Sequence, residues 1–287
     1  MDIIFLFYMG EMQDKCGPFS TKKYTCYTSE SLLKMRDAWN RMHPDDVIVH
    51  TSPQKIWNHF RTRFNDVCSI EKCWLRKIFT DSNREIGKIE HETFAPKRPA
   101  KWKKNPREWL TSIDISRVMS QYESKYKRFA FLGAVPVDFA GTLRNKKCVV
   151  NDLCVFDIKK YMDRGKTCFG MAINTDPHTR GGEHWTSLYM EIVNNKASIT
   201  FFDSSGIEPM DEVYDFADDI EEQLKPLGIK CKLYYNEVRH QYSRSECGMY
   251  AIYFISHMLN GTLSKFKINN MVIPDKDMIK MRNHFFG

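Results

Sequence analysis

The sequence predicts an α+β fold: a central mixed or antiparallel sheet flanked by helices, preceded by a mostly helical N-terminal part. Short runs that alternate apolar and polar residues gather between residues 167 and 235, as expected for the strands of one sheet. Apolar residues recur at intervals of three and four before and between these runs, as expected for amphipathic helices. Of the 287 residues, 42% are hydrophobic and 13% aromatic, which favours a packed core over disorder.

The N-terminal part, residues 1–107, is interpreted as a basic and mostly helical domain. Met1–Met9 is apolar, but it carries Asp2 and lacks a basic lead-in. We therefore expect a buried first strand there rather than a signal peptide. A helix entry is expected near Ser29, and Pro53–Phe64 carries its apolar residues at helical intervals.

A stretch rich in proline and lysine, Pro96–Pro106, is the predicted domain boundary. Residues 1–107 hold 20 Lys and Arg against 13 Asp and Glu, whereas residues 108–287 hold 23 of each. The whole positive excess therefore lies before the boundary, and it is densest in residues 97–107. We favour a solvated linker for this stretch, and contact with DNA or with an acidic partner surface is the alternative.

The second part begins with a helix and continues with strands. Ile113–Tyr126 has the pattern of an amphipathic helix, and Thr167–Ile173 that of a strand. His184–Val193 alternates apolar and polar residues, and Asn194-Asn195 forms a tight-turn signal before the run Ala197–Asp203. These last two runs are therefore predicted to pair as a hairpin.

The remaining pattern is helix, strand and helix. Asp211–Leu224 carries one apolar face and is followed by Gly228, a stop signal. Ile229–Tyr235 alternates as a strand. Glu246–Leu259 is a strongly apolar helix, for which Ser245 is the predicted N-cap.

The nine cysteines are an odd number for a secreted disulfide framework. With no signal peptide expected, we predict reduced thiols in an intracellular, reducing compartment. The closest pairs, Cys68/Cys73 and Cys148/Cys154, lack the spacing and paired histidines of a zinc site, so they are interpreted as small buried apolar residues. No metal or cofactor is predicted, and no apolar run reaches the roughly 20 residues of a membrane span.

Three residues at predicted element ends have the chemistry of a thiol acyl-transfer site. His184 begins one strand of the hairpin and Asp203 ends the other, so their side chains are expected to meet. Asp203 would fix the imidazole tautomer, and the second ring nitrogen would face a nucleophile. Cys247 lies at a predicted helix start, where unpaired N–H groups and the helix dipole favour the thiolate.

Two further residues complete the predicted site. Gln241 can donate an amide N–H to a developing oxyanion, together with the Cys247 backbone N–H. Gly248 removes a side chain where a substrate backbone would approach. Taken singly, such residues are more often structural: an inert buried cysteine, an edge histidine, a turn aspartate or a surface amide. Their joint occurrence in these positions favours the catalytic interpretation.

With these residues, the chain resembles the SUMO/ubiquitin-like protein protease superfamily, the adenain-like cysteine proteases. The motifs that carry the resemblance are His184-Trp185, Asp203, Gln241 and Cys247-Gly248. The branch of polyprotein-processing proteases from African swine fever virus and giant viruses is the most similar, through residues 169–176, 239–241 and 277–286. The resemblance implies a papain-like core over residues 108–287 and a helical arm domain over residues 1–107.

The resemblance also implies a role for each motif residue. Cys247 would be the nucleophile and His184 the general base and acid. Asp203 would orient the histidine, at a position where the African swine fever virus enzyme carries Asn and the cellular SUMO proteases carry Asp. Gln241 would donate to the oxyanion. Trp185 would roof a narrow channel that admits only residues without side chains, which favours cleavage at Gly-Gly-X sites.

The implied function is a cysteine endopeptidase that processes viral structural polyproteins during virion maturation. Such an enzyme would act in the virion and in the host cytoplasm. The alternative is an isopeptidase for SUMO or another ubiquitin-like protein, which shares the fold and the site. An acetyltransferase is a more distant relative in the same group. From another class, a nucleic-acid or scaffold-binding protein with an inactive protease domain would explain the basic residues 97–107.

Overall fold

The computed structural model of the chain describes residues 15–18, 20, 24–79 and 83–287. The strand predicted over Met1–Met9 lies outside the described residues. Contacts divide the chain into two compact units, one with residues up to Arg98 and His284–Gly287, the other with Pro99–Asn283. The domain boundary predicted after residue 107 stays a prediction. None of the described helices is both long and apolar enough to cross a membrane.

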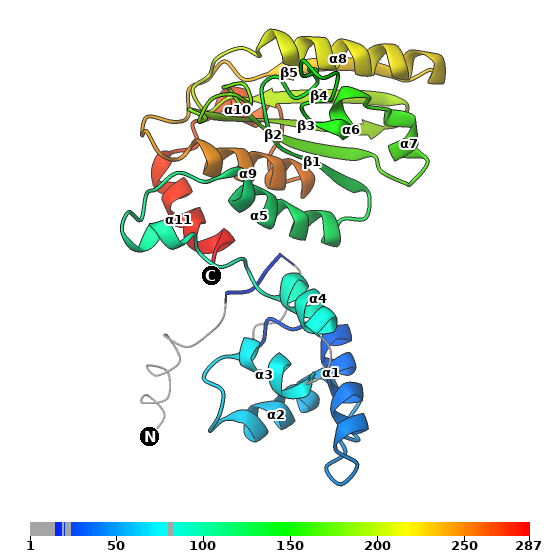
Figure 1. Cartoon of the computed structure of the whole chain (residues 1–287), viewed down its shortest axis with the longest axis vertical. Coiled ribbons are helices and arrows are strands. Elements are labelled where there is room, and N and C mark those ends of the chain that lie inside the picture. The colour runs from blue at the N-terminus through cyan, green and yellow to red at the C-terminus, as the bar shows by residue number, and fades with distance from the viewer. Residues whose placement is uncertain (1–14, 19, 21–23, 80–82) are drawn as a thin grey trace. The chain divides into compact units, whose positions relative to one another are not determined.

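The first unit is helical. Its described helices are α1 (Ser29–Met42), α2 (Pro53–Phe64), α3 (Glu71–Ile78) and α4 (Asn83–Thr93) (Figure 1). Helix α1 begins after Thr28, whose side chain accepts a hydrogen bond from the Ser31 N–H at 3.0 Å. Trp39, Phe60 and Trp74, one from each of the first three helices, are buried against one another. An aromatic core therefore holds this unit together.

The second unit is built on a mixed five-stranded sheet. Its strands, in their order across the sheet, are β1 (Phe129–Pro136), β2 (Cys168–Asn174), β3 (Trp185–Val193), β4 (Lys196–Phe202) and β5 (Lys230–Tyr235). The pairs β2/β3 and β3/β4 are antiparallel, whereas β1/β2 and β4/β5 are parallel. The predicted α+β class with a mixed sheet is confirmed. Strand β1 was not predicted, because its apolar run does not alternate.

The β3–β4 hairpin forms at the predicted turn. Asn194 and Asn195 have positive φ, 51° and 57°, and Val193 pairs directly with Lys196. Two left-handed residues in a two-residue loop make a type I′ turn, which asparagine tolerates and which matches the twist of the strands. The turn fixes the register, so the residue before β3 and the residue after β4 lie at the same end of the sheet.

Helices cover both faces of the sheet (Figure 1). Helices α5 (Ser112–Lys125) and α9 (Cys247–Leu259) lie on one face, and α8 (Asp211–Leu224) lies on the other. The bounds of α8 are those predicted, and Gly228 follows it with φ of 69°. The other elements are η1 (Ala100–Lys103), α6 (Asn151–Cys154), α7 (Ile158–Met162), η2 (Lys225–Leu227), α10 (Lys267–Asn270) and α11 (Asp275–Phe285).

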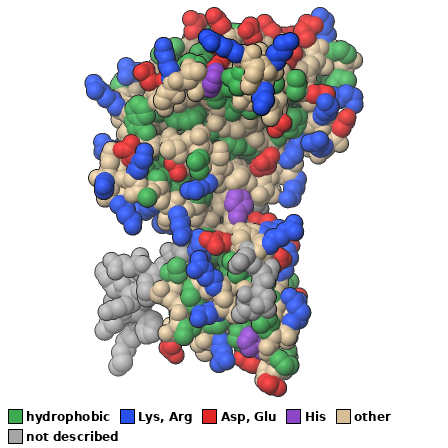
Figure 2. Space-filling view, viewed as in Figure 1, with side chains coloured by type: hydrophobic (Ala, Val, Ile, Leu, Met, Phe, Trp, Pro, Cys, Tyr) green, Lys and Arg blue, Asp and Glu red, His purple; other side chains and the backbone are tan. Residues whose placement is uncertain are grey.

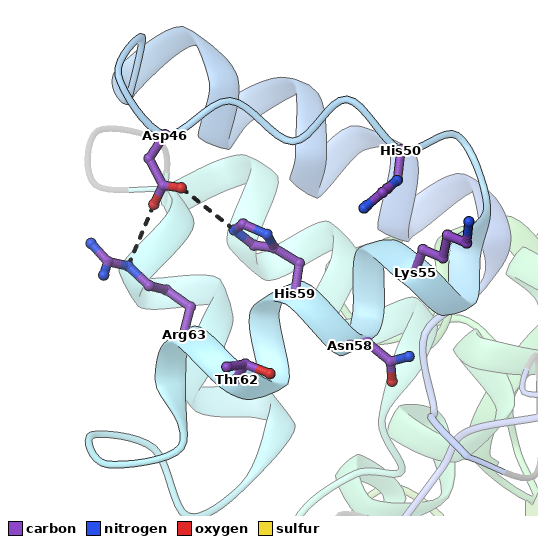
Figure 3. Close-up of a pocket in the computed structure, with 7 residues that line it drawn as sticks. All are labelled: Asp46, His50, Lys55, Asn58, His59, Thr62 and Arg63. Carbon is purple, nitrogen blue, oxygen red and sulfur yellow. Dashed lines mark ion pairs between the residues drawn. The ribbon is translucent and has the colours of Figure 1, made fainter.

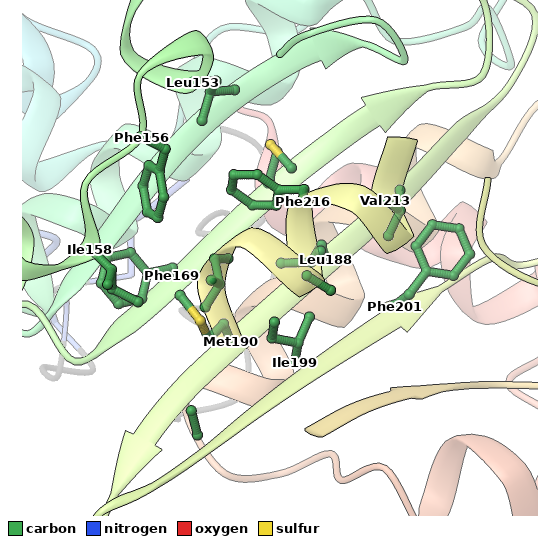
Figure 4. Packing of buried hydrophobic residues seen from close by; sticks show 14 of the residues in the cluster. Leu153, Phe156, Ile158, Phe169, Leu188, Met190, Ile199, Phe201, Val213 and Phe216 are labelled. Carbon is green, nitrogen blue, oxygen red and sulfur yellow. The ribbon is translucent and has the colours of Figure 1, made fainter. Parts of the chain in front are cut away.

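Because both faces are covered, the central strands are buried on both sides. Leu188, Met190 and Phe201 of the sheet pack with Val213 and Phe216 of α8 in one hydrophobic core (Figure 4). The opposite face of β3 packs against α9. The sheet is thus a rigid platform, and the ends of β3 and β4 can hold side chains in fixed positions.

Six of the described cysteines are paired in three disulfides, contrary to the prediction of reduced thiols. The pairs are Cys16–Cys26, Cys68–Cys73 and Cys148–Cys154. Their Cα atoms lie 4.9 to 5.6 Å apart, within the bridging range. That proximity is set by the fold, so the prediction of reduced thiols was wrong for these six. Cys168, Cys231 and Cys247 are free thiols.

The basic stretch that opens the second unit is more ordered than a linker. Trp102 is buried, and its indole N–H donates to the Glu108 carbonyl at 3.0 Å. Lys101, Lys103 and Lys104 beside it are exposed. The favoured interpretation as a solvated linker is therefore wrong for Trp102, whereas the lysine charges do face solvent.

Candidate active site

The sheet brings His184 and Asp203 together. His184 directly precedes β3, and Asp203 directly follows β4. The imidazole Nε2 donates to the Asp203 Oδ1 at 2.7 Å. The Thr175 N–H donates to the His184 carbonyl at 2.9 Å, which anchors the backbone of the histidine. This is the contact that the hairpin pattern predicted.

Asp203 is buried, and both its side chain and its backbone are hydrogen-bonded. Its Oδ1 also accepts the Ser205 N–H at 2.7 Å. The side-chain amide of Asn236 accepts the Asp203 N–H at 3.0 Å and donates to the Asp203 carbonyl at 2.7 Å. With 3% of its surface exposed, the carboxylate cannot rotate away, so the orientation of the histidine is fixed.

Cys247 is the first residue of α9. The prediction that Ser245 is the N-cap of α9 is wrong, because Glu246 occupies the cap position. The Ser245 hydroxyl donates instead to the Glu246 Oε1 at 3.0 Å. The Glu246 side chain makes no capping hydrogen bond to the first turn of α9. Cys247 thus lies at a helix start as predicted, although the cap residue is different, and the effect of the helix dipole on its thiol stays a prediction.

The His184 imidazole holds its proton strongly. Burial, the largest single effect, lowers its pKa, but hydrogen bonds to Asp203 and Cys247 and the charges of both together raise the pKa to about 10. At neutral pH the ring is an imidazolium with a hydrogen bond to Cys247. The arrangement can supply a sulfur nucleophile and a proton from neighbouring side chains.

Gln241 is anchored beside the aspartate segment. Its Oε1 accepts from the Ser204 hydroxyl at 2.7 Å, and its backbone N–H donates to the Ser204 carbonyl at 2.8 Å. Its Nε2 donates one proton to the Ser243 carbonyl at 2.7 Å. An amide nitrogen has a second proton, which is the one available to an oxyanion. Because Ser204 follows Asp203, the same turn positions the histidine orienter and the predicted oxyanion donor.

Trp185 and Gly248 pack against each other at Leu110. The indole N–H of Trp185 donates to the Leu110 carbonyl at 3.0 Å. A Cβ on Gly248 would lie 3.0 Å from the Leu110 Cβ and 3.4 Å from the Trp185 Cδ1. The absent side chain therefore makes room for these two residues, and their approach narrows the surroundings of Cys247, which is 2% exposed.

Sequence reasoning missed the residues that support the site. Asn236, Ser204 and Leu110 carry no local signal, because their partners lie 33, 37 and 75 residues away. Glu246 could have been noticed as a charge that opens an otherwise apolar helix. Its partner, Arg282, is 36 residues further along the chain and was not predictable from spacing.

Two pockets are lined by residues outside the candidate active site. One, of about 560 Å³ in the first unit, is shown in Figure 3. Its carboxylate, Asp46, lies 3.6 Å from the Arg63 Nε, whose charge it offsets, and 4.0 Å from the His59 Nε2. The other, of about 410 Å³ in the second unit, is lined by Asp138, Glu212, Asp215 and Asp219 among others. In the described ranges, no three His, Cys, Asp or Glu side chains gather to hold a metal ion.

Comparison with known proteins gives relatives for most of the chain. The putative thiol protease R355 of Acanthamoeba polyphaga mimivirus is 28% identical over 269 residues, 86% of this chain and 84% of that protein. The SUMO-1 cysteine protease of African swine fever virus is 27% identical over 184 residues, 62% of this chain and 67% of that protein. Both are homologues of this chain.

Two further findings concern the fold and the family. The crystal structure of the African swine fever virus protease matches with a TM-score of 0.66 at 19% identity, over 96% of each chain, which shows the same fold. The model of a family described as YopJ serine/threonine acetyltransferase matches residues 148–282, a little under half of the chain. That range includes every residue predicted for the site.

Proposed function

We propose that this chain, a cysteine peptidase of the SUMO-protease-like group related to the African swine fever virus protease, is an endopeptidase that cuts at Gly-Gly-X sites. Its substrates would be viral structural polyproteins, cut during virion maturation in the virion and in the host cytoplasm. The observation that carries the proposal is the chain of hydrogen bonds from Cys247 through His184 to Asp203. The viral origin of both relatives supports the choice of substrate.

The proposed reaction has two halves, the formation of a thioester on Cys247 and the hydrolysis of that thioester. The Cys247 thiolate attacks the scissile carbonyl carbon, and the oxyanion that forms accepts N–H groups from Gln241 and from the Cys247 backbone. The C–N bond then breaks, and the leaving amine takes the proton of the His184 imidazolium. In the second half, His184 takes a proton from water, and the hydroxide attacks the carbonyl carbon of the thioester. The C–S bond then breaks, the carboxylic acid leaves, and the Cys247 thiolate and the His184 imidazolium are restored.

The tight surroundings of Cys247 support the preference for glycine. Cys247 is 2% exposed and Trp185 is 8% exposed. Trp185 is fixed by its hydrogen bond to Leu110, so it does not easily swing aside. A substrate residue with a side chain next to the scissile bond would have to displace one of these groups, whereas glycine would not.

A peptide series tests this preference. Replacing the glycine directly before the scissile bond by alanine is expected to lower kcat/KM by about 10- to 200-fold, the range typical of one methyl group in a closed pocket. Product formation is followed by mass spectrometry. The matched control changes residue X after the bond and is expected to alter the rate by less. Equal cleavage of the glycine and alanine peptides contradicts the proposed channel.

The isopeptidase alternative is separated by its substrate. Cysteine-reactive probes made from SUMO or ubiquitin are incubated with the protein, and covalent adducts of Cys247 are measured. The endopeptidase proposal predicts cleavage of candidate virion polyproteins at Gly-Gly-X, seen as new product masses, and slow or absent labelling by the probes. Fast labelling by a modifier probe without cleavage of those polyproteins favours the isopeptidase.

A second candidate is acyl transfer to a serine or threonine. The match of residues 148–282 to the YopJ acetyltransferase family favours it, since a thioester on Cys247 could pass its acyl group to a hydroxyl instead of to water. Incubation with acetyl-coenzyme A and protein substrates distinguishes the two. Acetylated products, together with intact Gly-Gly-X peptides, would favour the transferase.

The exposed lysines of residues 97–107 motivate a further proposal, contact with DNA. Acidic and basic side chains are interspersed on the face shown in Figure 2, so a local cluster rather than the net charge would carry binding. Changing Lys101, Lys103 and Lys104 to glutamine is expected to weaken binding to a DNA duplex. The dependence of log affinity on log salt should decrease by up to about 3, one for each lost phosphate contact.

The control for this prediction is a second exposed basic cluster in the same unit. Arg144, Lys146 and Lys147 are also exposed, and their change to glutamine removes the same charge. Fluorescence anisotropy with a labelled duplex at several salt concentrations measures both variants. Equal losses in the two variants would mean that only the total charge matters, which contradicts a specific contact through residues 97–107.

A further inference from the structure

A buried ion pair lies directly beside the predicted nucleophile. Arg282 on α11 donates from its Nε to the Glu246 Oε2 at 2.8 Å. The two side chains are 4% and 0% exposed, and Glu246 is the residue before Cys247. A buried carboxylate and a buried guanidinium have both lost their hydration, so separating them would leave two uncompensated buried charges. Cys247 therefore starts its helix from a position fixed by Arg282.

The same guanidinium also holds the backbone at two separate places. Its Nη2 donates to the Ser245 carbonyl at 3.0 Å. Its Nη1 donates to the Glu108 carbonyl at 2.9 Å and to the Pro106 carbonyl at 3.3 Å. The guanidinium carbon lies 4.5 Å from the centre of the Trp102 ring. Because the fork of N–H groups is planar and rigid, these contacts cannot move independently of one another.

The segment Pro106–Glu108, whose carbonyls Arg282 binds, continues to Leu110, which contacts Trp185 on the side of the site opposite the residues before Cys247. Two residues after Glu108, the Leu110 carbonyl accepts the indole N–H of Trp185. The Leu110 side chain also lies against Gly248. One arginine thus joins the residues before Cys247 to the segment that holds Trp185.

We propose that Arg282 is a positioning residue for the peptidase reaction, which fixes the nucleophile and the Trp185 wall relative to each other. The inference rests on the proposed function, because the benefit is realised when a peptide lies between these two walls. Arg282 touches no reacting atom. Its loss would displace both walls, and a displacement of about 1 Å at a catalytic centre costs about 100-fold in rate.

The pair has a second effect, on charge. The titratable and charged groups near the start of α9 are His184 with Asp203, Glu246 with Arg282, and Tyr250 with Asp275. If Arg282 alone is removed, the Glu246 carboxylate is left unpaired next to Cys247. A like charge disfavours the thiolate, so alkylation of the cysteine then requires a higher pH. Removal of both members of the pair cancels this effect.

Four variants test the proposal: Arg282→Met, Arg282→Lys, the double variant Glu246→Gln with Arg282→Met, and Lys280→Met. Each is measured for thermal unfolding, for kcat and KM with a Gly-Gly-X peptide, and for the rate of Cys247 alkylation by iodoacetamide against pH. Arg282→Met is expected to lose about 100-fold in kcat with little change in KM. Its alkylation profile is expected to shift to higher pH.

The other variants separate charge from geometry. Arg282→Lys keeps a positive charge but not the fork, and the double variant keeps neither charge. Both are expected to show the alkylation profile of the unchanged protein and still a low kcat, because the backbone anchors are lost. They also serve if Arg282→Met fails to fold, since neither leaves an unpaired buried charge. Lys280, which is exposed on the same helix and pairs with Asp277 at the surface, is the control expected to change nothing.

An unchanged kcat in a folded Arg282→Lys or double variant would overturn the proposal, and so would an unchanged alkylation profile in a folded Arg282→Met. The alkylation measurement needs no substrate. If the unchanged protein cuts no Gly-Gly-X peptide, the proposed function fails by itself. The shift in Arg282→Met and its reversal in the double variant then still decide whether the ion pair acts on Cys247.

Discussion

Replacing Cys247 by alanine is expected to abolish cleavage of a Gly-Gly-X peptide, with a loss in kcat of about 10⁶-fold, as for other removed nucleophiles. Without the sulfur no acyl-enzyme forms. The substitution also removes the hydrogen bond and the charge of Cys247, two of the effects that raise the pKa of His184. Product masses at fixed times, measured at equal concentrations of folded protein, give the comparison.

Cys231 provides the matched control for this experiment. It is also a free thiol, half-buried on β5. Burial and the nearby charge of Glu221 raise its pKa to about 11, so it is protonated and unreactive at neutral pH. Cys231→Ala is expected to cleave at the rate of the unchanged protein. Residual cleavage by Cys247→Ala, or a comparable loss in Cys231→Ala, would assign the chemistry to another residue.

The parts of the fold that could be predicted from the sequence are those with a local cause. The turn at Asn194-Asn195 sets the hairpin register by itself, and so His184 and Asp203 met as expected. Helix α8 has one apolar face and a glycine stop, and both of its ends were predicted. Cys247 begins an apolar run, which was enough to place it at a helix start.

The parts that could not be predicted depend on distant partners. Ser245 has the chemistry of an N-cap, but the structure gives its hydroxyl to Glu246, whose position is set by Arg282. The three disulfides depend on Cα atoms that the fold brings within bridging distance. Trp102 was predicted to belong to a charged linker, yet it is buried because Arg282 and Glu108 contact it. In each case the deciding contact spans elements that no local pattern connects.

The raised pKa of His184 predicts an unusual pH dependence of activity. The ordinary pKa of histidine is about 6.5, and that of His184 is about 10. Because the shift is upward, the ring keeps its proton throughout this interval and loses it only as the pH rises through about 10. The leaving amine needs that proton, so kcat/KM is expected to persist well above pH 7 and to fall near pH 10. Rates measured from pH 5 to 11 with a stable peptide give this limit.

Two substitutions of Asp203 separate the effect of its charge on the alkaline limit of activity from its effect on the orientation of the His184 ring. The Asp203 Oδ1 accepts from both His184 and the Ser205 N–H, so the amide oxygen of an Asp203→Asn side chain is expected to keep both bonds. Only the charge is lost. Because the charge of Asp203 is one of the effects that raise the pKa of His184, the alkaline limit should move to lower pH.

Asp203→Ala removes the hydrogen bond as well as the charge, so the imidazole is free to turn. Its kcat is expected to fall by about 10⁴-fold, the size seen when a histidine orienter is lost, whereas Asp203→Asn, which keeps the hydrogen bond, should lose less. The Ser205→Ala variant, which keeps the backbone N–H, is the control and should retain both rate and limit. An alkaline limit that stays near pH 10 in Asp203→Asn would show that the Asp203 charge does not hold the proton on His184. Equal losses of kcat in the Asn and Ala variants would instead show that charge, rather than orientation, is what this aspartate contributes.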